Sequence, residues 1–167
     1  MGDKLMISEI AKTQLNAAAL EVFGMMYYTP VELLPDLPEQ ERWQVEDHYI
    51  KTVIDYSGSL QANICFYFPR SLAVNIAGGF LGLDEEAISD HQLIDTMREA
   101  ANMIVGNFLG RIDTEGACTL GIPDAEVITG FSPAAVRHEG ELLAFISDFG
   151  FLWMTYKGNC SAVMLDE

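Results

Sequence analysis

The stretch that decides the fold covers residues 89–114 and reads SDHQLIDTMREAANMIVGNFLGRIDT. At about 100° per residue, its apolar residues fall on one side of a single long helix. A stripe of this width must face a core. It consists of Leu93, Ile94, Met97, Ala101, Ile104, Val105, Phe108 and Ile112.

The opposite side of the same helix carries a narrow polar row, formed by Asp95, Glu99, Asn102 and Gly106 and continued by Gly110. Their spacing makes them neighbours along one helix face. A solvated surface would explain the polar residues, because exposed polar rows are normal. The glycines need another reason, since each costs about 1 kcal/mol relative to alanine inside a helix. Close approach by another backbone and internal packing are the two explanations.

Composition predicts one domain over residues 1–167. Half of the residues are apolar, which is enough for a sizeable core in a chain of this length. Asp and Glu total 25 against 9 Lys and Arg, which gives a formal charge of −16. This charge argues against nucleic acid and anionic membranes, since both bind through clustered basic side chains.

The cysteines and the N-terminus predict a cytoplasmic protein. Cys65, Cys118 and Cys160 are too sparse for a disulfide framework and form no metal-binding pair. We expect each to lie in the core as a small apolar residue. The N-terminus has no long apolar segment of a secretory signal, and no apolar run approaches the length of a membrane span.

Two helices and a hairpin are expected before the long helix. Ser8 is a candidate N-cap for a helix that ends near Tyr28, and Pro69 can begin a second helix that reaches Leu81. The apolar face of the first helix comprises Ile10, Ala11, Leu15, Ala18, Val22 and Met25. Between these helices we expect an irregular crossing with an edge strand near residues 31–34, then a hairpin of residues 48–56 and 60–68.

After the long helix the pattern turns to short strands. The expected extended segments are residues 118–122, 127–129, 140–147, 151–156 and 160–165, with a hairpin turn at residues 148–150. Residues 21–25 (EVFGM) loosely repeat residues 99–103 (EAANM), with Gly24 in the place of Asn102. A chance likeness is the alternative. The prediction is an α+β fold, a pseudo-twofold duplicated unit with two long helices packed on a mostly antiparallel sheet.

Common catalytic motifs are missing from the chain. It contains no HExxH, no glycine-rich phosphate loop and no sign of a Ser-His-Asp arrangement. His48, His91 and His138 share no ligand spacing and are predicted to be surface or turn residues. The polar row is therefore the candidate site.

The pattern Asp95-xxx-Glu99-xx-Asn102, followed by Pro123 in LGIP, resembles the motif of the CheC/CheX/FliY family of chemotaxis phosphatases. The segment EAANMIVGN is most similar to the CheX branch. The resemblance implies hydrolysis of the aspartyl phosphate on a CheY-like response-regulator receiver, at one site per chain. It implies no cofactor of the chain's own, with Mg²⁺ carried by the receiver.

The resemblance also assigns roles. Asn102 would hold the attacking water, since one amide offers a donor and an acceptor. Glu99 would pair with a lysine of the receiver. Asp95, Gly106 and Pro123 would dock the partner and shape the site.

The alternative is a non-catalytic receiver-binding or dimeric signalling module with a degenerate site. Gly24 and the short passage between Asn102 and Pro123 motivate it. We also expect a homodimer that pairs through sheet edges, for which residues 160–166 (CSAVMLD) are a candidate edge strand.

Overall fold

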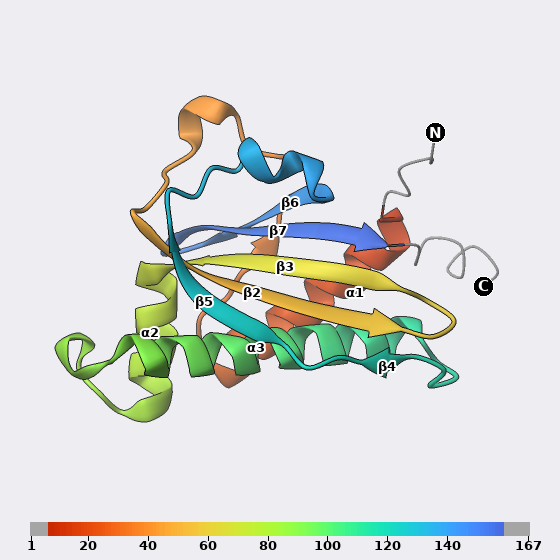
Figure 1. The fold of residues 1–167 in the computed structure, drawn as a ribbon, viewed down its shortest axis with the longest axis horizontal. Coiled ribbons are helices and arrows are strands. Elements are labelled where there is room, and N and C mark those ends of the chain that lie inside the picture. The colour runs from red at the N-terminus through yellow and green to blue at the C-terminus, as the bar shows by residue number, and fades with distance from the viewer. Residues whose placement is uncertain (1–6, 159–167) are drawn as a thin grey trace.

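The computed structural model describes residues 7–158. The predicted strand at residues 160–165 and Cys160 lie outside this range. Within it, the protein has a helical layer against one face of a curled sheet and irregular segments over part of the other face (Figure 1). The predicted α+β class is confirmed.

All strand pairs among the described residues are antiparallel. The strand order is β1-β6-β7-β3-β2, and β2 pairs on its outer side with both β4 and β5. The strands are β1 (Glu32–Leu33), β2 (His48–Ser57), β3 (Ala62–Pro69), β4 (Thr119–Leu120), β5 (Asp124–Thr129), β6 (Glu141–Ser147) and β7 (Gly150–Gly158). The short edge strand and both predicted hairpins are confirmed.

The helices begin where the sequence places their caps. Ser8 Oγ accepts a hydrogen bond from Ala11 N at 3.1 Å, and Ser89 forms a capping box with Gln92. The main helices are α1 (Glu9–Ala19), its π-helical continuation η1 (Leu20–Met26), α2 (Arg70–Leu81) and α3 (Asp90–Ile112). Single 3-10 turns are η2 (Gln40–Arg42), η3 (Glu85–Ala87) and η4 (Ala135–His138).

The strand order shows the predicted duplication. Exchanging β1 with β5, β2 with β6 and β3 with β7 reverses the order of the sheet and leaves every pairing among these six strands intact. The same operation exchanges α1 with α3, which precede their strands in the chain and cover the same face of the sheet (Figure 1). The pseudo-twofold axis therefore passes between β3 and β7.

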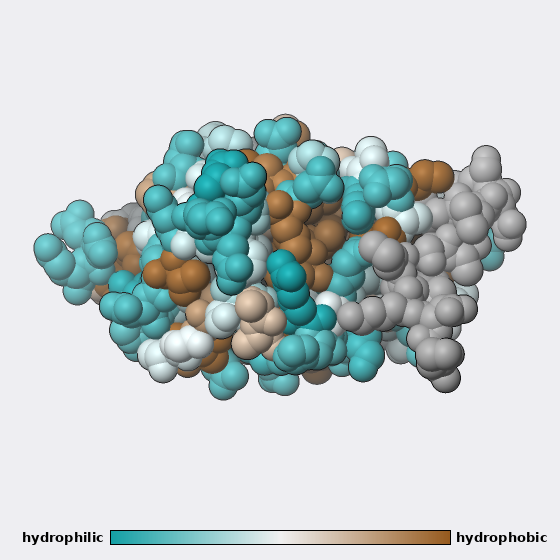
Figure 2. Space-filling model, turned by 90° about the horizontal axis from the view of Figure 1, so that it is seen from above, coloured by the Kyte–Doolittle hydropathy of each residue, from teal (hydrophilic) through white to brown (hydrophobic). Residues whose placement is uncertain are grey.

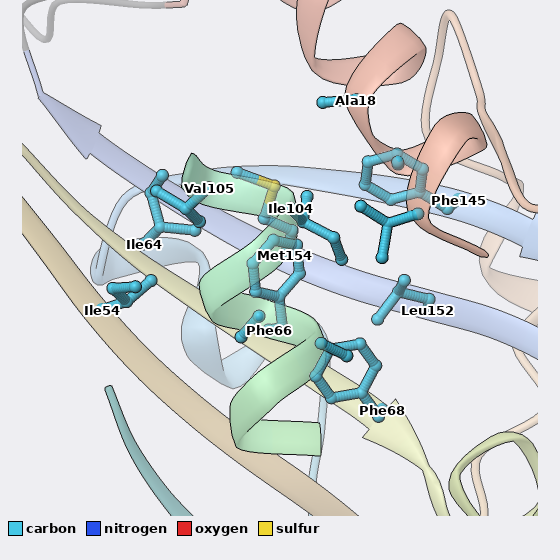
Figure 3. Packing of buried hydrophobic residues seen from close by; sticks show 14 of the residues in the cluster. Ala18, Ile54, Ile64, Phe66, Phe68, Ile104, Val105, Phe145, Leu152 and Met154 are labelled. Atoms are coloured by element: carbon cyan, nitrogen blue, oxygen red, sulfur yellow. The ribbon is translucent and has the colours of Figure 1, made fainter. Parts of the chain in front are cut away.

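The apolar stripe of α3 faces the core, as predicted. Ile104 and Val105 have no exposed surface and point toward side chains from the sheet, such as Phe66 and Met154 (Figure 3). Ala18 of α1 approaches the same cluster from the neighbouring helix. Because the stripe is committed to this core, the polar row of α3 must face outward.

The predicted face of the first helix needs two corrections. Ile10 is 48% exposed and Met25 is 73% exposed. Ile10 lies about 100° around the helix from buried Ala11, beyond the side that the core covers. Met25 lies in η1, where wider i→i+5 turns change the angle between successive residues and rotate it out of the apolar face.

A second apolar layer covers the opposite face of the sheet, and the sequence did not reveal it. Trp43, from the proline-bearing crossing, packs edge-on against Trp153 of β7 with ring centroids 5.2 Å apart. Phe131 stacks on Tyr67 of β3 at 4.5 Å. Figure 2 looks down on this face and shows brown side chains gathered in a hollow between polar neighbours.

Candidate functional site

The polar row lies on the outer face of α3. Asp95 and Glu99 are exposed, whereas Asn102 and Gly106 are half-buried. The Asp95 carboxylate is engaged within its own helix, 3.2 Å from His91 Nε2 and 3.4 Å from Arg98 Nη1. In this row, Asp95 is already engaged by a histidine and an arginine of its own helix, and Glu99 is the acid further along.

Glu99 and Asn102 are the side chains of the row with open hydrogen-bonding capacity. Neither side chain has a hydrogen bond or an ion pair with another residue in the range 7–158. They stand three residues apart, so they are neighbours on the helix surface. An unpaired carboxylate beside an unpaired amide can take one cation and one water from outside the chain.

One side of the row is bounded by the end of η1. Tyr27 packs against Phe23 and against Phe80 of α2, with ring centroids 6.1 and 6.0 Å apart. Burial, together with the nearby charge of Glu99, raises the pKa of Tyr27 to about 12. Tyr27 thus lies within electrostatic range of the acid of the site.

The segment from β4 to β5 runs beside α3 on the sheet side and contains Pro123 (Figure 1). A Cβ placed on Gly106 would lie 3.6 Å from Leu120 Cδ2, whereas one on Gly110 would meet nothing within 4 Å. Leu120 of the same chain is therefore a neighbour of Gly106, but at an ordinary van der Waals distance, so internal packing within the described residues does not demand a glycine at either position. The role of Gly106 toward a partner remains a prediction.

The passage that leads to Pro123 is tied down by side-chain and backbone hydrogen bonds. The Asp113 carboxylate accepts from Cys118 N at 2.7 Å and Ala117 N at 3.1 Å, and these bonds lower its pKa. Gly121 N donates to Asp55 O of β2 at 2.7 Å. Sequence reasoning missed this anchor, although an Asp directly after a helix is a frequent turn residue.

The symmetry-related helix has an acid but no amide. Glu21 of η1 is tied to α3, because Arg111 Nη2 lies 2.7 Å from its Oε2. Hydrogen bonding from Asn107 and the Arg111 guanidinium lower the pKa of Glu21. Gly24 stands where the symmetry would need the amide.

No other region in the described range competes with the row for chemistry. A hollow of about 1430 Å³ is lined mainly by β2, β3, β6 and β7, and it contains no residue of the row. Between residues 7 and 158 no group of three His, Cys, Asp or Glu side chains is arranged to hold a metal ion. No helix in this range is both long and apolar enough to cross a membrane.

The fold and the row together define a class: a duplicated α+β protein that displays an acid and an amide on one long helix. Comparison with protein families identifies it further. Residues 50–146, more than half of the chain, match the family described as chemotaxis phosphatase CheX. The chain belongs to this family, as the resemblance in the sequence indicated. A comparison with curated protein sequences finds no match.

Several solved structures share the fold. Chemotaxis protein CheX from Vibrio vulnificus superposes with a TM-score of 0.69 at 18% identity, over 95% of this chain and 99% of that one. A CheC-like superfamily protein from a Shewanella species gives 0.66 at 18%, over 91% and 99%. A CheX-CheY-BeF3-Mg²⁺ complex from Borrelia burgdorferi contains a chain that gives 0.64 at 17%, over 92% and 99%.

Proposed function

We propose that this chain is a phosphatase that hydrolyses the aspartyl phosphate of a CheY-like response-regulator receiver, at one active site per chain. The observation that carries the proposal is the unpaired Glu99 and Asn102 on the outer face of α3. Membership of the CheX family supports it. The Borrelia burgdorferi structure supports it too, because there a related chain is in complex with CheY, BeF3 and Mg²⁺.

In the proposed reaction a water attacks phosphorus, and the bond from phosphorus to the aspartyl oxygen breaks. The products are inorganic phosphate and the free carboxylate of the receiver. The Asn102 amide orients the water in line with the leaving oxygen, and the water's proton passes to the phosphate oxygens because an amide is not a base. This chain supplies positioning, while the Mg²⁺ expected on the receiver neutralises charge.

The other residues of the row are assigned to binding the receiver and to shaping the site. Glu99 is exposed and lacks a cation of its own in the described range, so it can pair with a lysine of the receiver. Asp95 is already shared between His91 and Arg98, so we assign it to orienting that helix turn. We keep Gly106 and Pro123 as residues that shape the site.

The test follows phosphate loss from a panel of phosphorylated receivers with Mg²⁺. We expect Asn102→Ala and Glu99→Ala to lose the acceleration that the wild type gives. Glu115→Ala is the matched control, because Glu115 is an exposed acid that lies beyond the end of α3. Equal decay with wild type and both row variants would refute the proposal.

Receiver binding without catalysis is the second candidate. Gly24 supports this candidate, because it leaves Glu21 without an amide three residues on. Calorimetry with a beryllofluoride-treated receiver, run beside the phosphate assay, separates the two. Binding without accelerated hydrolysis would favour the second candidate.

A homodimer and a cytoplasmic location complete the proposal. Cys65 and Cys118 are free thiols, in keeping with a reducing compartment. Light scattering at micromolar concentration tests the dimer, and a monomer there would remove it.

A further inference from the structure

Four exposed apolar side chains come from the ends of two elements, η1 and α2, that both pack against α3, the helix that carries the row. Met25 is 73% exposed, Met26 53%, Tyr28 86% and Phe80 67%. We call these four residues the docking ridge. They come from the end of η1 and the end of α2, which Tyr27 joins by packing its ring against Phe80. Asn75 Nδ2 of α2 also donates to Thr29 Oγ1 at 2.9 Å, so the two elements are fixed together.

The backbone holds Tyr28 in a conformation that tyrosine seldom adopts. Its φ is +53°, and among the described residues it is the one non-glycine residue with positive φ. A glycine is usual where a helix ends in this conformation. Thr29 N donates to Phe23 O at 2.8 Å and closes the end of η1 around it. A strained tyrosine whose ring stands in solvent, two residues after the end of a π-helical segment, points to function.

The position of the docking ridge near the candidate site indicates which partner it would bind. The helix that carries the row, α3, contacts both η1 and α2. Tyr27, which lies between the ridge residues in sequence, is also close enough to Glu99 to feel its charge. A protein partner of ordinary size covers about 800 Å² on each side, a disc of roughly 16 Å radius. A domain of this size that brings a phosphoryl group to Asn102 would reach the ends of η1 and α2, because both elements contact α3. Single exposed apolar residues need no explanation, but four together beside a site do.

The acidic residues near the docking ridge indicate what kind of partner surface it would bind. Shortly after α2 come three exposed acids, Asp84, Glu85 and Glu86. The charge of Glu99 acts on Tyr27 as well. The complementary surface is therefore an apolar patch bordered by lysine or arginine. It lies on the same domain as the phosphoryl group, because one rigid partner has to reach both.

We infer that the docking ridge binds an apolar, cation-bordered face of the phosphorylated receiver and supplies much of the affinity for it. The inference rests on the proposed function. In this arrangement the half of the duplicated fold that lacks the amide contributes binding, and the half with Asn102 contributes the positioned water.

The test uses the full chain with the receiver that the wild type dephosphorylates. Met25→Ser and Tyr28→Gly are expected to raise both KM and the Kd for the beryllofluoride-treated receiver by roughly tenfold, with kcat within about twofold of wild type. Tyr28→Gly should not lower Tm, because glycine suits the positive φ. Ile10→Ser is the matched control: Ile10 is exposed on the same helix, about 20 Å from Met25, and its loss should change neither constant.

Three outcomes would overturn the inference. The first is unchanged KM and Kd in both ridge variants while Asn102→Ala abolishes turnover, which leaves the proposed function standing. The second is a change from dimer to monomer in the ridge variants by sedimentation, which would assign the ridge to a second copy of this chain. The third is a wild type that binds no receiver, which removes the proposed function also. Weakened binding in the ridge variants together with full turnover by Asn102→Ala would instead sink the phosphatase mechanism and keep the ridge.

Discussion

The two long helices of this protein occupy equivalent places in a duplicated fold, yet their acids have different surroundings. Glu99 of α3 is exposed and has no cation beside it in the described range, with Asn102 three residues on. Glu21 of η1 is paired with Arg111 at 2.7 Å, and Gly24 offers no amide. A carboxylate already bound to its own chain's cation is unavailable to a partner's. The comparison therefore teaches that equivalent placement alone does not make a site.

The helices also differ in shape. α3 runs from its capping box to Ile112 as a regular helix, which keeps the row on one line. α1 widens into the π-helical η1 and ends at the strained Tyr28. Duplication allows such divergence, because one copy can retain the spacing that chemistry needs while the other changes its surface.

The largest expected effect comes from moving the amide between the helices. Asn102→Gly should lower kcat by about 10² to 10³, roughly 3 to 4 kcal/mol, because the attacking water loses its positioned partner. Adding Gly24→Asn to that variant should restore nothing, since Arg111 still holds Glu21. Phosphate release from a phosphorylated receiver measures both.

Gly24→Asn alone serves as the folding control. A Cβ at Gly24 would lie 3.4 Å from Leu20 Cδ1, the end of a flexible side chain, so the substitution should be accommodated. If the double variant Asn102→Gly, Gly24→Asn recovered turnover, the two helices would not differ as argued, because η1 could then act as a second site.

The placement of the candidate site on the outer face of α3 could be predicted because the signals for this helix agree with one another locally. Its cap, its apolar stripe and its polar row all arise from spacing within one helix, and local spacing is what a sequence displays. The helix begins at Ser89 as predicted, and the apolar residues of the stripe, such as Leu93, Ile104 and Ile112, face the core. The hairpins followed in the same way from alternating residues around short turns.

The remaining features depend on contacts between distant segments. The π-helical turns of η1 have no local signature, so Met25 was wrongly placed in the apolar face. The pairing of Glu21 with Arg111 joins residues 90 positions apart. The layer in which Trp43 packs on Trp153 requires knowledge of how the crossing folds over the sheet. None of these can be seen from spacing.

A smaller effect, on the free energy of unfolding, should show whether Tyr28 is a strained residue or a packed one. Tyr28→Gly is expected to raise the free energy of unfolding by about 1 kcal/mol, since glycine adopts positive φ without the steric cost that tyrosine bears. Denaturant unfolding measures it, with Tyr27→Gly as a control that should destabilise by removing a packed ring. A loss of stability in Tyr28→Gly would show that its side chain packs, and would return that helix end to a structural role.

A still smaller effect, on Tm, should follow when the ion pair between Glu21 and Arg111 is removed. Because hydrogen bonds and Arg111 lower its pKa, the stability that Glu21 contributes is fully present above its unfolded pKa of about 4.3 and is lost as pH falls through the folded value. Arg111→Met should therefore lower Tm slightly at pH near 6 and progressively less as pH falls below about 4. Thermal unfolding across this range measures the difference, and a difference that does not depend on pH would mean that the ion pair contributes nothing.

The smallest expected effect tests the link between the two halves at the site. Burial is the main reason for the raised pKa of Tyr27 and Glu99 the lesser one, so Glu99→Gln should lower that pKa only modestly from about 12. A raised phenol pKa means that the stability it contributes is complete below about pH 10 and is lost as pH rises through the folded value. NMR titration of isotope-labelled tyrosine, with Tyr27→Phe to assign the signal, measures the change. If the pKa of Tyr27 were the same in Glu99→Gln as in the wild type, the charge of Glu99 would have no effect on Tyr27. The docking ridge would then have to act on the receiver independently of the acid that is proposed to hold its lysine.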